Sequence, residues 1–286
     1  MLTVKAYAKI NLALDVLYKR PDGYHEVNMV MQSIGLADTV TLTAGREDIA
    51  VTCNVANLAC DSTNLAYRAA AMLRDTTQVK AGAAIHLHKE IPLAAGLAGG
   101  SSNAAAVLAG LNRLWQLGLS QAELMTIGAA LGSDVPFCLA GGTMRAYGRG
   151  ELLERLPPLP PCYVVLAKPP VGVSTAWVYS QYRAENVVCH PDIIGMTVYL
   201  ANGDYSGVAA RLGNVLESVT LPAYPDVARI KESMLAGGAA ALMSGSGPTV
   251  FGLLTDGREA VQLADRLKAE TGAEVFTVQT VAEVEW

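Results

Sequence analysis

The amino-acid sequence predicts an α+β fold with two domains, and three observations carry this prediction. In the first half, a strand-like segment is followed by a glycine-rich loop and an alanine-rich helix, over residues 83–111. In the middle, four prolines within residues 157–161 form a stiff connector of the kind found between domains. Near the C-terminus, the hydrophobic pattern indicates two strands, a helix and a third strand.

The proline-rich connector sets the expected domain boundary. We expect an N-terminal domain over residues 1–157 and a C-terminal domain over residues 158–286. In the second domain, the order strand, strand, helix, strand is typical of a ferredoxin-like layer. Its four segments are residues 239–242, 250–254, 258–270 and 273–280.

Composition and charge narrow the class of protein. With 286 residues, of which 51% are hydrophobic and 16% charged, the chain can bury a substantial core. The formal net charge of −5 comes without a basic cluster, so we expect no nucleic-acid partner. A compact phosphate-bearing molecule held by backbone N–H groups agrees with this charge.

The five cysteines form no recognisable framework. They are odd in number, widely spaced and without a Cys-x-x-Cys pair, so we expect neither disulfides nor a zinc site. Lys5 and Lys9 interrupt what would be the apolar stretch of a signal peptide, which favours a cytoplasmic protein. The uncharged runs 91–111 and 233–255 are broken by glycine, serine and proline, so we expect no membrane-spanning helix.

The first element is a strand over residues 8–18. Apolar residues occupy its even positions, whereas Lys9, Asn11 and Asp15 fall on the other face. This alternation predicts a half-buried strand with a polar face. Solvent exposure and a functional site explain that face equally well.

A tight turn follows and presents two ring side chains. Pro21-Asp22-Gly23 has turn chemistry, and Tyr24 and His25 lead from it into a strand over residues 27–35. Together the two rings can stack on a planar base and bond its edge, although a turn histidine is more often merely solvated. Two short strands (39–43 and 49–52) and a helix (64–74, capped by Asp61 or Ser62) come next.

The glycine-rich loop has the features of an anion site. Its glycines let a ligand approach the backbone, and the following helix supplies free N–H donors and the positive end of its dipole. It lacks both the Gly-Lys-Ser/Thr ending of a Walker loop and the Gly-x-Gly-x-x-Gly spacing of a dinucleotide fold. A flexible linker is the alternative, but a solvated linker would rarely carry Leu93 and Leu97. The predicted phosphate loop consists of Pro92, Leu93, Ala94, Ala95, Gly96, Leu97, Ala98, Gly99, Gly100, Ser101 and Ser102.

Two further helices follow in the first domain. Ser120 to Glu123 is a capping box that opens a helix ending near Leu131. Asp134 then precedes a short helix that tolerates Pro136 in its first turn, so the local pattern favours Asp134 as a helix cap.

Glycines also mark the remaining elements. Glycine pairs bracket a short strand near residues 143–147, and a buried strand (163–168), a helix (174–182) and several short helices (192–235) follow. The run Ser244-Gly245-Ser246-Gly247 separates two strand-like segments, which predicts the turn of a hairpin.

Three of these elements together resemble the GHMP kinase superfamily. They are the strand with Lys9-x-Asn11, the loop 92–102 and the glycine turn 244–248, in this order along the chain. The resemblance covers essentially the whole chain. It implies a two-domain fold, with an N-terminal α/β domain like ribosomal protein S5 and a C-terminal ferredoxin-like α+β domain.

Four shorter matches resemble one branch of that superfamily. They are residues 6–12, 22–26, 132–137 and 214–217. This branch acts on a cytidine-diphosphate-linked methylerythritol in the non-mevalonate isoprenoid pathway. The resemblance implies transfer of the ATP γ-phosphoryl group to the 2-hydroxyl of that substrate, with Mg²⁺.

The resemblance also implies roles for individual residues. Asp134 is expected to act as the general base, with Lys9 as its electrostatic partner. The ATP phosphates would lie against the backbone of the loop 92–102. The expected substrate-binding residues are Asn11, Tyr24, His25, Tyr179, Ser244, Gly245, Ser246 and Gly247.

Several points remain open at the level of the sequence. Trp177 lies close to Tyr179 and competes for its role as the second aromatic on the base. No acidic magnesium ligand is identifiable by motif, and the oligomeric state is undetermined. A homoserine or mevalonate type of kinase, which would lack the Asp-Gly-Tyr-His element, and a non-catalytic nucleotide-binding relative are the alternatives. Retention of both Lys9 and Asp134 argues against the second of these.

Overall fold

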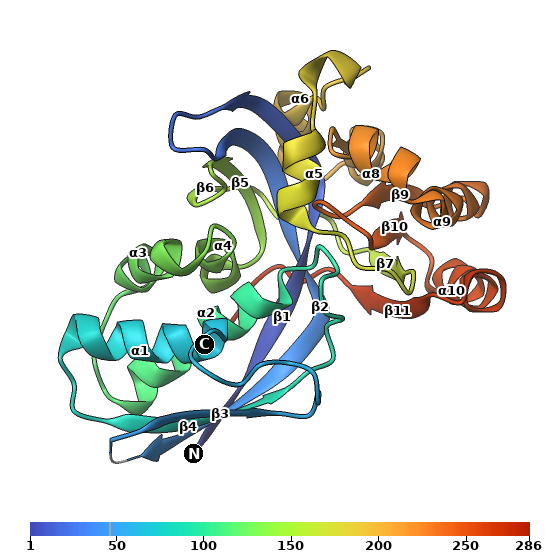
Figure 1. The fold of residues 1–286 in the computed structure, drawn as a ribbon. Helices are drawn as coiled ribbons and strands as arrows, with labels where there is room; N and C mark the ends of the chain where they lie inside the picture. Colours follow the sequence, from blue (N-terminus) through green and yellow to red (C-terminus); the bar gives the residue numbers. More distant parts are fainter. Residues whose placement is uncertain (46) are drawn as a thin grey trace.

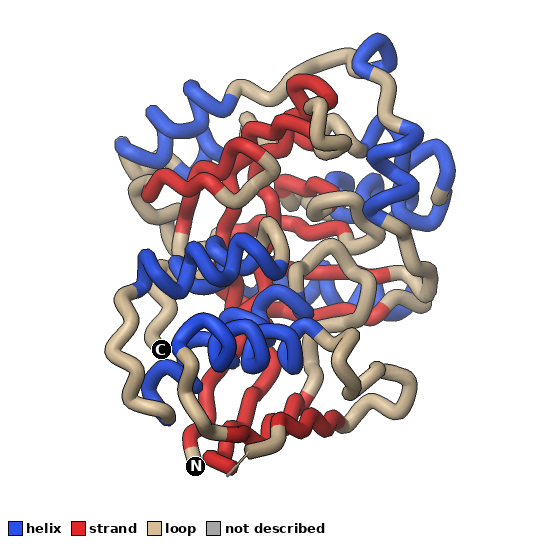
Figure 2. The backbone as a smooth tube through the Cα atoms, turned by 60° about the vertical axis from the view of Figure 1, so that its left-hand side comes forward, coloured by secondary structure: helices blue, strands red, loops and turns tan. Residues whose placement is uncertain are grey.

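The computed structural model describes residues 1–45 and 47–286, which form two β-sheets with helices packed against them (Figure 1). The first sheet is seven-stranded and the second is four-stranded. Figure 2 shows helices lying across the strands of the first sheet. The fold is therefore α+β, as the sequence predicts.

The first sheet is built around one long antiparallel hairpin. Its strands are β1 (Leu2–Lys19), β2 (His25–Gly45), β3 (Ile49–Cys53), β4 (Gly82–His88), β5 (Thr143–Gly148), β6 (Leu152–Arg155) and β8 (Gly213–Asn214). The order is β3-β4-β2-β1-β8, and β5 joins β2 to β6. β2 unites the two strands predicted at 27–35 and 39–43. The break in the pattern between them is a bulge, where the register with β1 shifts between Ala37 and Ile34.

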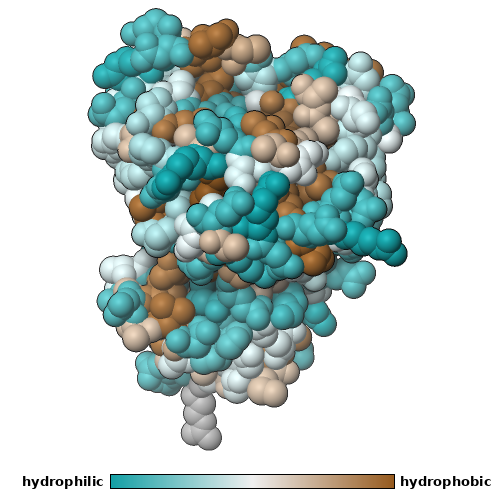
Figure 3. Space-filling view, turned by 90° about the vertical axis from the view of Figure 1, so that its right-hand side faces the viewer, coloured by the Kyte–Doolittle hydropathy of each residue, from teal (hydrophilic) through white to brown (hydrophobic). Residues whose placement is uncertain are grey.

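The second sheet is antiparallel throughout. Its strands are β7 (Tyr163–Lys168), β9 (Ala240–Met243), β10 (Val250–Leu254) and β11 (Glu274–Gln279), in the order β11-β7-β10-β9. β9 and β10 form the hairpin predicted on either side of the glycine turn. The face shown in Figure 3 is mainly polar, with its apolar residues in small separate groups.

Helices cover both sheets. They are α1 (Leu65–Thr77), α2 (Gly99–Leu114), α3 (Gln121–Leu131), α4 (Val135–Ala140), α5 (Thr175–Gln181), the 3₁₀ helix η1 (Ala184–Asn186), α6 (Ile193–Ala201), α7 (Tyr205–Ala209), α8 (Glu217–Ala223), α9 (Pro225–Ala236) and α10 (Gly257–Thr271). α2 packs on β1 and β2, whereas α9 and α10 pack on the second sheet. Within the part of the chain that the structure describes, no helix combines the length and apolar character needed to cross a membrane.

Two helix starts test the predicted caps. Ser120 and Glu123 form the predicted capping box, with both reciprocal hydrogen bonds present. The predicted cap of α1 is wrong, because the side chain of Asn64 caps this helix by accepting from the N–H of Ala66. Asp61 instead accepts hydrogen bonds from Thr63.

The predicted polar face of β1 is buried rather than solvated. Residues 8–16 are buried on both faces, including Lys9, Asn11 and Asp15. Ile10 belongs to the same apolar cluster as Phe251 of β10, so the second sheet covers one side of β1. α2 and α4 contact the same strand. A strand enclosed in this way exposes no polar face to water.

The two sheets are joined by more than the proline-rich connector. The chain leaves β6 at Arg155 and enters β7 at Tyr163. Between these strands, we propose residue 157 as the end of the N-terminal domain. β8 then returns to the first sheet, where it pairs in parallel with β1 at Ala13 and Leu14. The N–H of Val281 also donates to the carbonyl of Ser33 at 2.9 Å. The C-terminal half thus completes the edge of the N-terminal sheet.

Candidate active site

A large cleft lies where the three glycine-rich or polar motifs meet. Its volume is about 1150 Å³. The lining residues come from β1, from the turn before β2, from the loop before α2, from the starts of α4 and α5, and from the turn between β9 and β10. The predicted site residues in its wall are Lys9, Asn11, Tyr24, His25, Asp134, Tyr179, Gly245, Ser246 and the loop from Pro92 to Ser101.

Gly96 joins the three motifs. Its carbonyl accepts from Lys9 Nζ at 3.1 Å and from Ser244 Oγ at 3.0 Å. Its backbone is left-handed (φ +74°), and an added Cβ would lie 2.3 Å from the carbonyl oxygen of Ser244. Glycine is therefore required here for both the conformation and the close approach of the two loops.

Lys9 and Asp134 lie close together in the wall of the cleft. Lys9 Nζ donates to Asn11 Oδ1 at 2.7 Å and lies 4.0 Å from Asp134 Oδ2. The Lys9 side chain is only 6% exposed, whereas that of Asp134 is 32% exposed. Asp134 occupies the N-cap position of α4, but its side chain makes no capping hydrogen bond. The local interpretation of Asp134 as a cap is therefore wrong for the side chain, which is left to face the cleft.

The loop before α2 presents backbone N–H groups to the cleft. Ala94, Gly96 and Ala98 have positive φ angles, and Ala98 is the N-cap residue of α2 but supplies no side-chain capping bond. The first N–H groups of a helix have no intrahelical acceptor, so those of α2 are available to an anion. A Cβ on Gly99 would lie 3.0 Å from Ile91 Cγ2, and one on Gly100 would lie 3.5 Å from Leu65 Cδ1.

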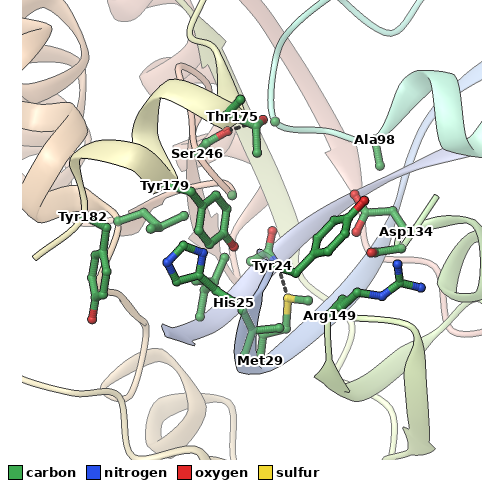
Figure 4. A pocket seen from close by; sticks show the side chains of 18 of the residues that line it. Tyr24, His25, Met29, Ala98, Asp134, Arg149, Thr175, Tyr179, Tyr182 and Ser246 are labelled. Carbon is green, nitrogen blue, oxygen red and sulfur yellow. Dashed lines mark hydrogen bonds between the residues drawn. The ribbon is translucent and has the colours of Figure 1, made fainter. Parts of the chain in front are cut away.

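Three ring side chains, Tyr24, His25 and Tyr179, line the same cleft (Figure 4). Tyr24 ends the turn before β2, His25 is the first residue of β2, and Tyr179 comes from α5. The ring centroids of His25 and Tyr179 are 5.1 Å apart. The guanidinium carbon of Arg149 lies 4.9 Å from the centre of the Tyr24 ring. Trp177 packs edge-on against Tyr224 and is not in the cleft wall, so Tyr179 is the aromatic that α5 places there.

Burial and nearby charges shift the pKa values of two of these side chains in opposite directions. Partial burial, and secondarily the positive charge of Lys19, lower the pKa of His25. Its imidazole is therefore neutral at pH 7 and offers one donor and one acceptor. Burial, and secondarily the charge of Asp134, raise the pKa of Tyr179. Its hydroxyl therefore stays protonated.

Three predicted binding residues support the cleft from behind rather than line it. Ser102 Oγ donates to the carbonyl of Tyr7 at 2.7 Å, and Ser244 Oγ is bound to Gly96 as described. A Cβ on Gly247 would meet Met243 Sδ at 2.6 Å, because this residue packs inside the turn. Asn214 holds the same turn by donating to the carbonyls of Met243 and Gly245, at 2.9 and 2.8 Å.

Several residues of the cleft wall carry no clear signal in the sequence. The sulfur of Met29 accepts a hydrogen bond from the side-chain amide of Asn11 at 3.2 Å. The hydroxyls of Thr175 and Ser246 are hydrogen-bonded at 2.9 Å. Arg149 stands between Gly148 and Gly150, which the sequence marks only as the end of a strand. A charged side chain held between two glycines is the one feature that could have indicated it.

Comparisons with known proteins identify the family. The sequence-family model of the GHMP kinase N-terminal domain matches residues 64–142. The family model of the GHMP kinase C-terminal domain matches residues 196–273. A 4-diphosphocytidyl-2-C-methyl-D-erythritol kinase of Geobacillus kaustophilus (strain HTA426) is 53% identical over 99% of this chain and 98% of its own length. The chain belongs to the GHMP kinase family. The family resemblance drawn from the sequence is thereby confirmed.

A second relative and two solved structures are also similar to this chain. An enzyme of the same name from Brevibacillus brevis (strain 47 / JCM 6285 / NBRC 100599) is 50% identical over 99% of this chain and 98% of its own length. A crystal structure of 4-(cytidine 5'-diphospho)-2C-methyl-D-erythritol kinase superimposes with a TM-score of 0.83 at 32% identity, covering 98% of this chain and 99% of that one. A homoserine kinase from Cytophaga hutchinsonii has a TM-score of 0.76 at 19% identity, over 99% of this chain and 96% of that one, which shows the shared fold.

Proposed function

We propose that this GHMP kinase transfers the γ-phosphoryl group of ATP to the 2-hydroxyl of 4-diphosphocytidyl-2-C-methyl-D-erythritol, in the non-mevalonate pathway to isoprenoid precursors. The observation that carries the proposal is one cleft that holds the Lys9–Asp134 pair, the open start of α2 and the three rings of Tyr24, His25 and Tyr179. The relatives at 50–53% identity carry the corresponding name. We keep the cytoplasmic location expected from the sequence as part of this proposal.

Asp134 and Lys9 would act on the acceptor hydroxyl. Asp134 takes the hydroxyl proton as the oxygen attacks the γ-phosphorus, since its carboxylate is exposed to the cleft and makes no cap bond. Lys9 is fixed by Asn11 and by the carbonyl of Gly96, so its ammonium is already in place to stabilise charge on the attacking oxygen and the phosphoryl group. Phosphoryl transfer depends mainly on such positioning and charge stabilisation.

The loop before α2 would hold the phosphates of ATP. Its N–H groups at Gly99, Gly100 and Ser101 begin the helix, where the dipole favours an anion. Ala98 and Gly96 set the left-handed turns that aim these groups at the cleft. Backbone donors suit a chain whose net charge is −5, because they hold an anion without needing a full positive charge.

Magnesium belongs to the same proposal. Among residues 1–45 and 47–286, no group of three or more His, Cys, Asp or Glu side chains could hold a metal ion alone. This fits Mg²⁺, which keeps several waters and binds through substrate phosphates with one or two carboxylates. The hydroxyl of Ser101, in the cleft wall at the phosphate loop, would contact the ion, and the ion would neutralise charge on the phosphates.

The three rings in the cleft wall would select cytidine. Tyr24 and Tyr179 offer two ring faces for a stacked base, and neutral His25 offers a donor and an acceptor for its edge. Gly245 and Ser246 also line the cleft, and the substrate diphosphate would pass beside them. Homoserine and mevalonate carry no base, so such a pocket would serve no purpose in kinases of those types.

An acceptor assay tests the proposal. Purified protein with ATP and Mg²⁺ is given 4-diphosphocytidyl-2-C-methyl-D-erythritol, homoserine or mevalonate, and formation of ADP is followed. We expect ADP above background only with the cytidine compound. Comparable turnover of homoserine or mevalonate, or no turnover of any acceptor, would contradict the proposal.

A further inference from the structure

A buried charged cluster lies directly behind the phosphate loop. Asp38 of β2 is 0% exposed, and the side chain of Lys89, which directly follows β4 and precedes the loop, is 4% exposed. The two side chains form an ion pair, and the equally buried Asn103 bridges them. None of the roles assigned above to the cleft uses this cluster.

Asp38 binds both ends of the phosphate loop. Its Oδ1 accepts from the backbone N–H groups of Glu90 and Ile91, at 2.7 and 2.8 Å. Its Oδ2 accepts from the amide of Asn103 at 2.8 Å and from Lys89 Nζ. Glu90 and Ile91 precede the loop, whereas Asn103 lies in the second turn of α2. One carboxylate on a central strand thus fixes the two points between which the loop is stretched.

The cluster also reaches the back of the anion site. Lys89 Nζ lies 3.3 Å from the position that a Cβ on Gly99 would occupy, and Lys89 contributes to the cleft wall. The side-chain oxygen of Asn103 accepts from the same ammonium at 2.8 Å. The ammonium group of Lys89 therefore lies next to the first turn of α2, whose N–H groups would receive the phosphates.

Stability alone does not explain such a group. A buried ion pair costs much desolvation, and apolar side chains of similar volume are often as stable or more so. A carboxylate, however, can accept four hydrogen bonds in fixed directions, which no neutral side chain of this size can do. We propose that Asp38 is a positioning residue for ATP binding, which holds the start of the loop and the start of α2 at the spacing that the phosphates require. The inference rests on the proposed use of ATP by this cleft.

The substitution Asp38→Asn isolates this role. Its amide keeps one oxygen for the N–H groups of Glu90 and Ile91, but turns an NH₂ donor toward Lys89 and Asn103, which both donate to Asp38. Asn103→Ala removes only the bridge and keeps the ion pair. Thr143→Val is the matched control, because Thr143 is also buried and bonds Gln32 at 2.6 Å in β2, away from the loop.

Calorimetric titration measures binding of a non-hydrolysable ATP analogue with Mg²⁺, and separately of cytidine diphosphate, to all four proteins. We expect Asp38→Asn to weaken binding of the ATP analogue about tenfold or more, because small displacements of the binding groups have large effects at such a site. Asn103→Ala should weaken it in the same direction. Cytidine diphosphate should bind all variants as it binds the unmodified protein, and Thr143→Val should lower thermal stability without affecting either ligand.

The outcomes separate the inference from the proposed function. If the unmodified protein binds the ATP analogue and folded Asp38→Asn binds it within about twofold, the positioning role is refuted and the kinase proposal stands. A parallel loss of both ligands would equally refute it, as a general structural effect. Should Asp38→Asn not fold, Asn103→Ala decides by the same criterion. Failure of the unmodified protein to bind ATP would overturn the proposed function and this inference with it.

Discussion

Substitution of Gly96 by alanine should separate the demands of the active site from ordinary backbone strain. Two effects act at this position. The left-handed backbone (φ +74°) costs an alanine roughly 1–2 kcal/mol. The new Cβ would also lie 2.3 Å from the carbonyl oxygen of Ser244, and ordinary contact begins at 3.4 Å. The two loops must therefore separate by roughly 1 Å, and a misplacement of that size can reduce turnover about 10²-fold.

Gly118 provides the matched control for this prediction. Its φ is +70°, but no atom lies within 4 Å of the position that its Cβ would occupy. Gly118→Ala should thus show the strain alone, as a loss of roughly 1 kcal/mol in the free energy of unfolding with unchanged kcat. Gly96→Ala should lose more stability and about a hundredfold in kcat. Denaturant unfolding and an ADP-release assay measure both quantities. If the two variants behaved alike, the argument that Gly96 holds the Lys9 and Ser244 motifs together would be refuted.

Three further predictions concern the cleft. Asp134→Asn should lower kcat about 10²-fold or more while ATP still binds, because the amide keeps the shape but not the basicity; near-normal turnover would contradict the role as base. Tyr24→Ala should weaken the binding of cytidine diphosphate about ten- to a hundredfold, measured by calorimetry, because one stacking face is lost. Uridine diphosphate should bind poorly to the unmodified protein, and equal binding of both nucleotides would exclude selection of cytosine. Because the pKa of His25 is lowered by burial and by Lys19, its ring is neutral above its ordinary value of about 6.5 and gains a proton only as the pH falls through the lowered pKa. Affinity for cytidine diphosphate should therefore be constant from pH 7 to 8 and fall in acid, and His25→Gln should abolish that fall.

The sequence predicts the elements whose signal is local. The glycine loop before α2, the capping box at Ser120 and the hairpin turn at residues 244–247 are all determined by residues a few positions apart. The family motifs likewise lie within short segments. These features need no knowledge of what packs against them.

Features that depend on distant neighbours were predicted less well. The alternation in β1 left solvent exposure and a functional site equally open, because the partners that bury and bind its polar residues, such as Gly96 for Lys9, lie far along the chain. The same limit hides Asp38, whose four hydrogen-bond donors come from residues 89–103. Arg149 enters the cleft because β5 pairs with β2, which no local pattern reveals.

The return of β8 to the first sheet has a consequence for how the chain folds as it is synthesised. Until residue 214 has left the ribosome, β1 lacks its parallel partner at Ala13 and Leu14, although its long hairpin with β2 can already form. Contacts at residue 281 come later still. The N-terminal half therefore waits with an open strand edge, which is a template for pairing with other chains. A separately expressed fragment of residues 1–157 would keep that edge open permanently, so we expect it to aggregate more readily than the whole chain.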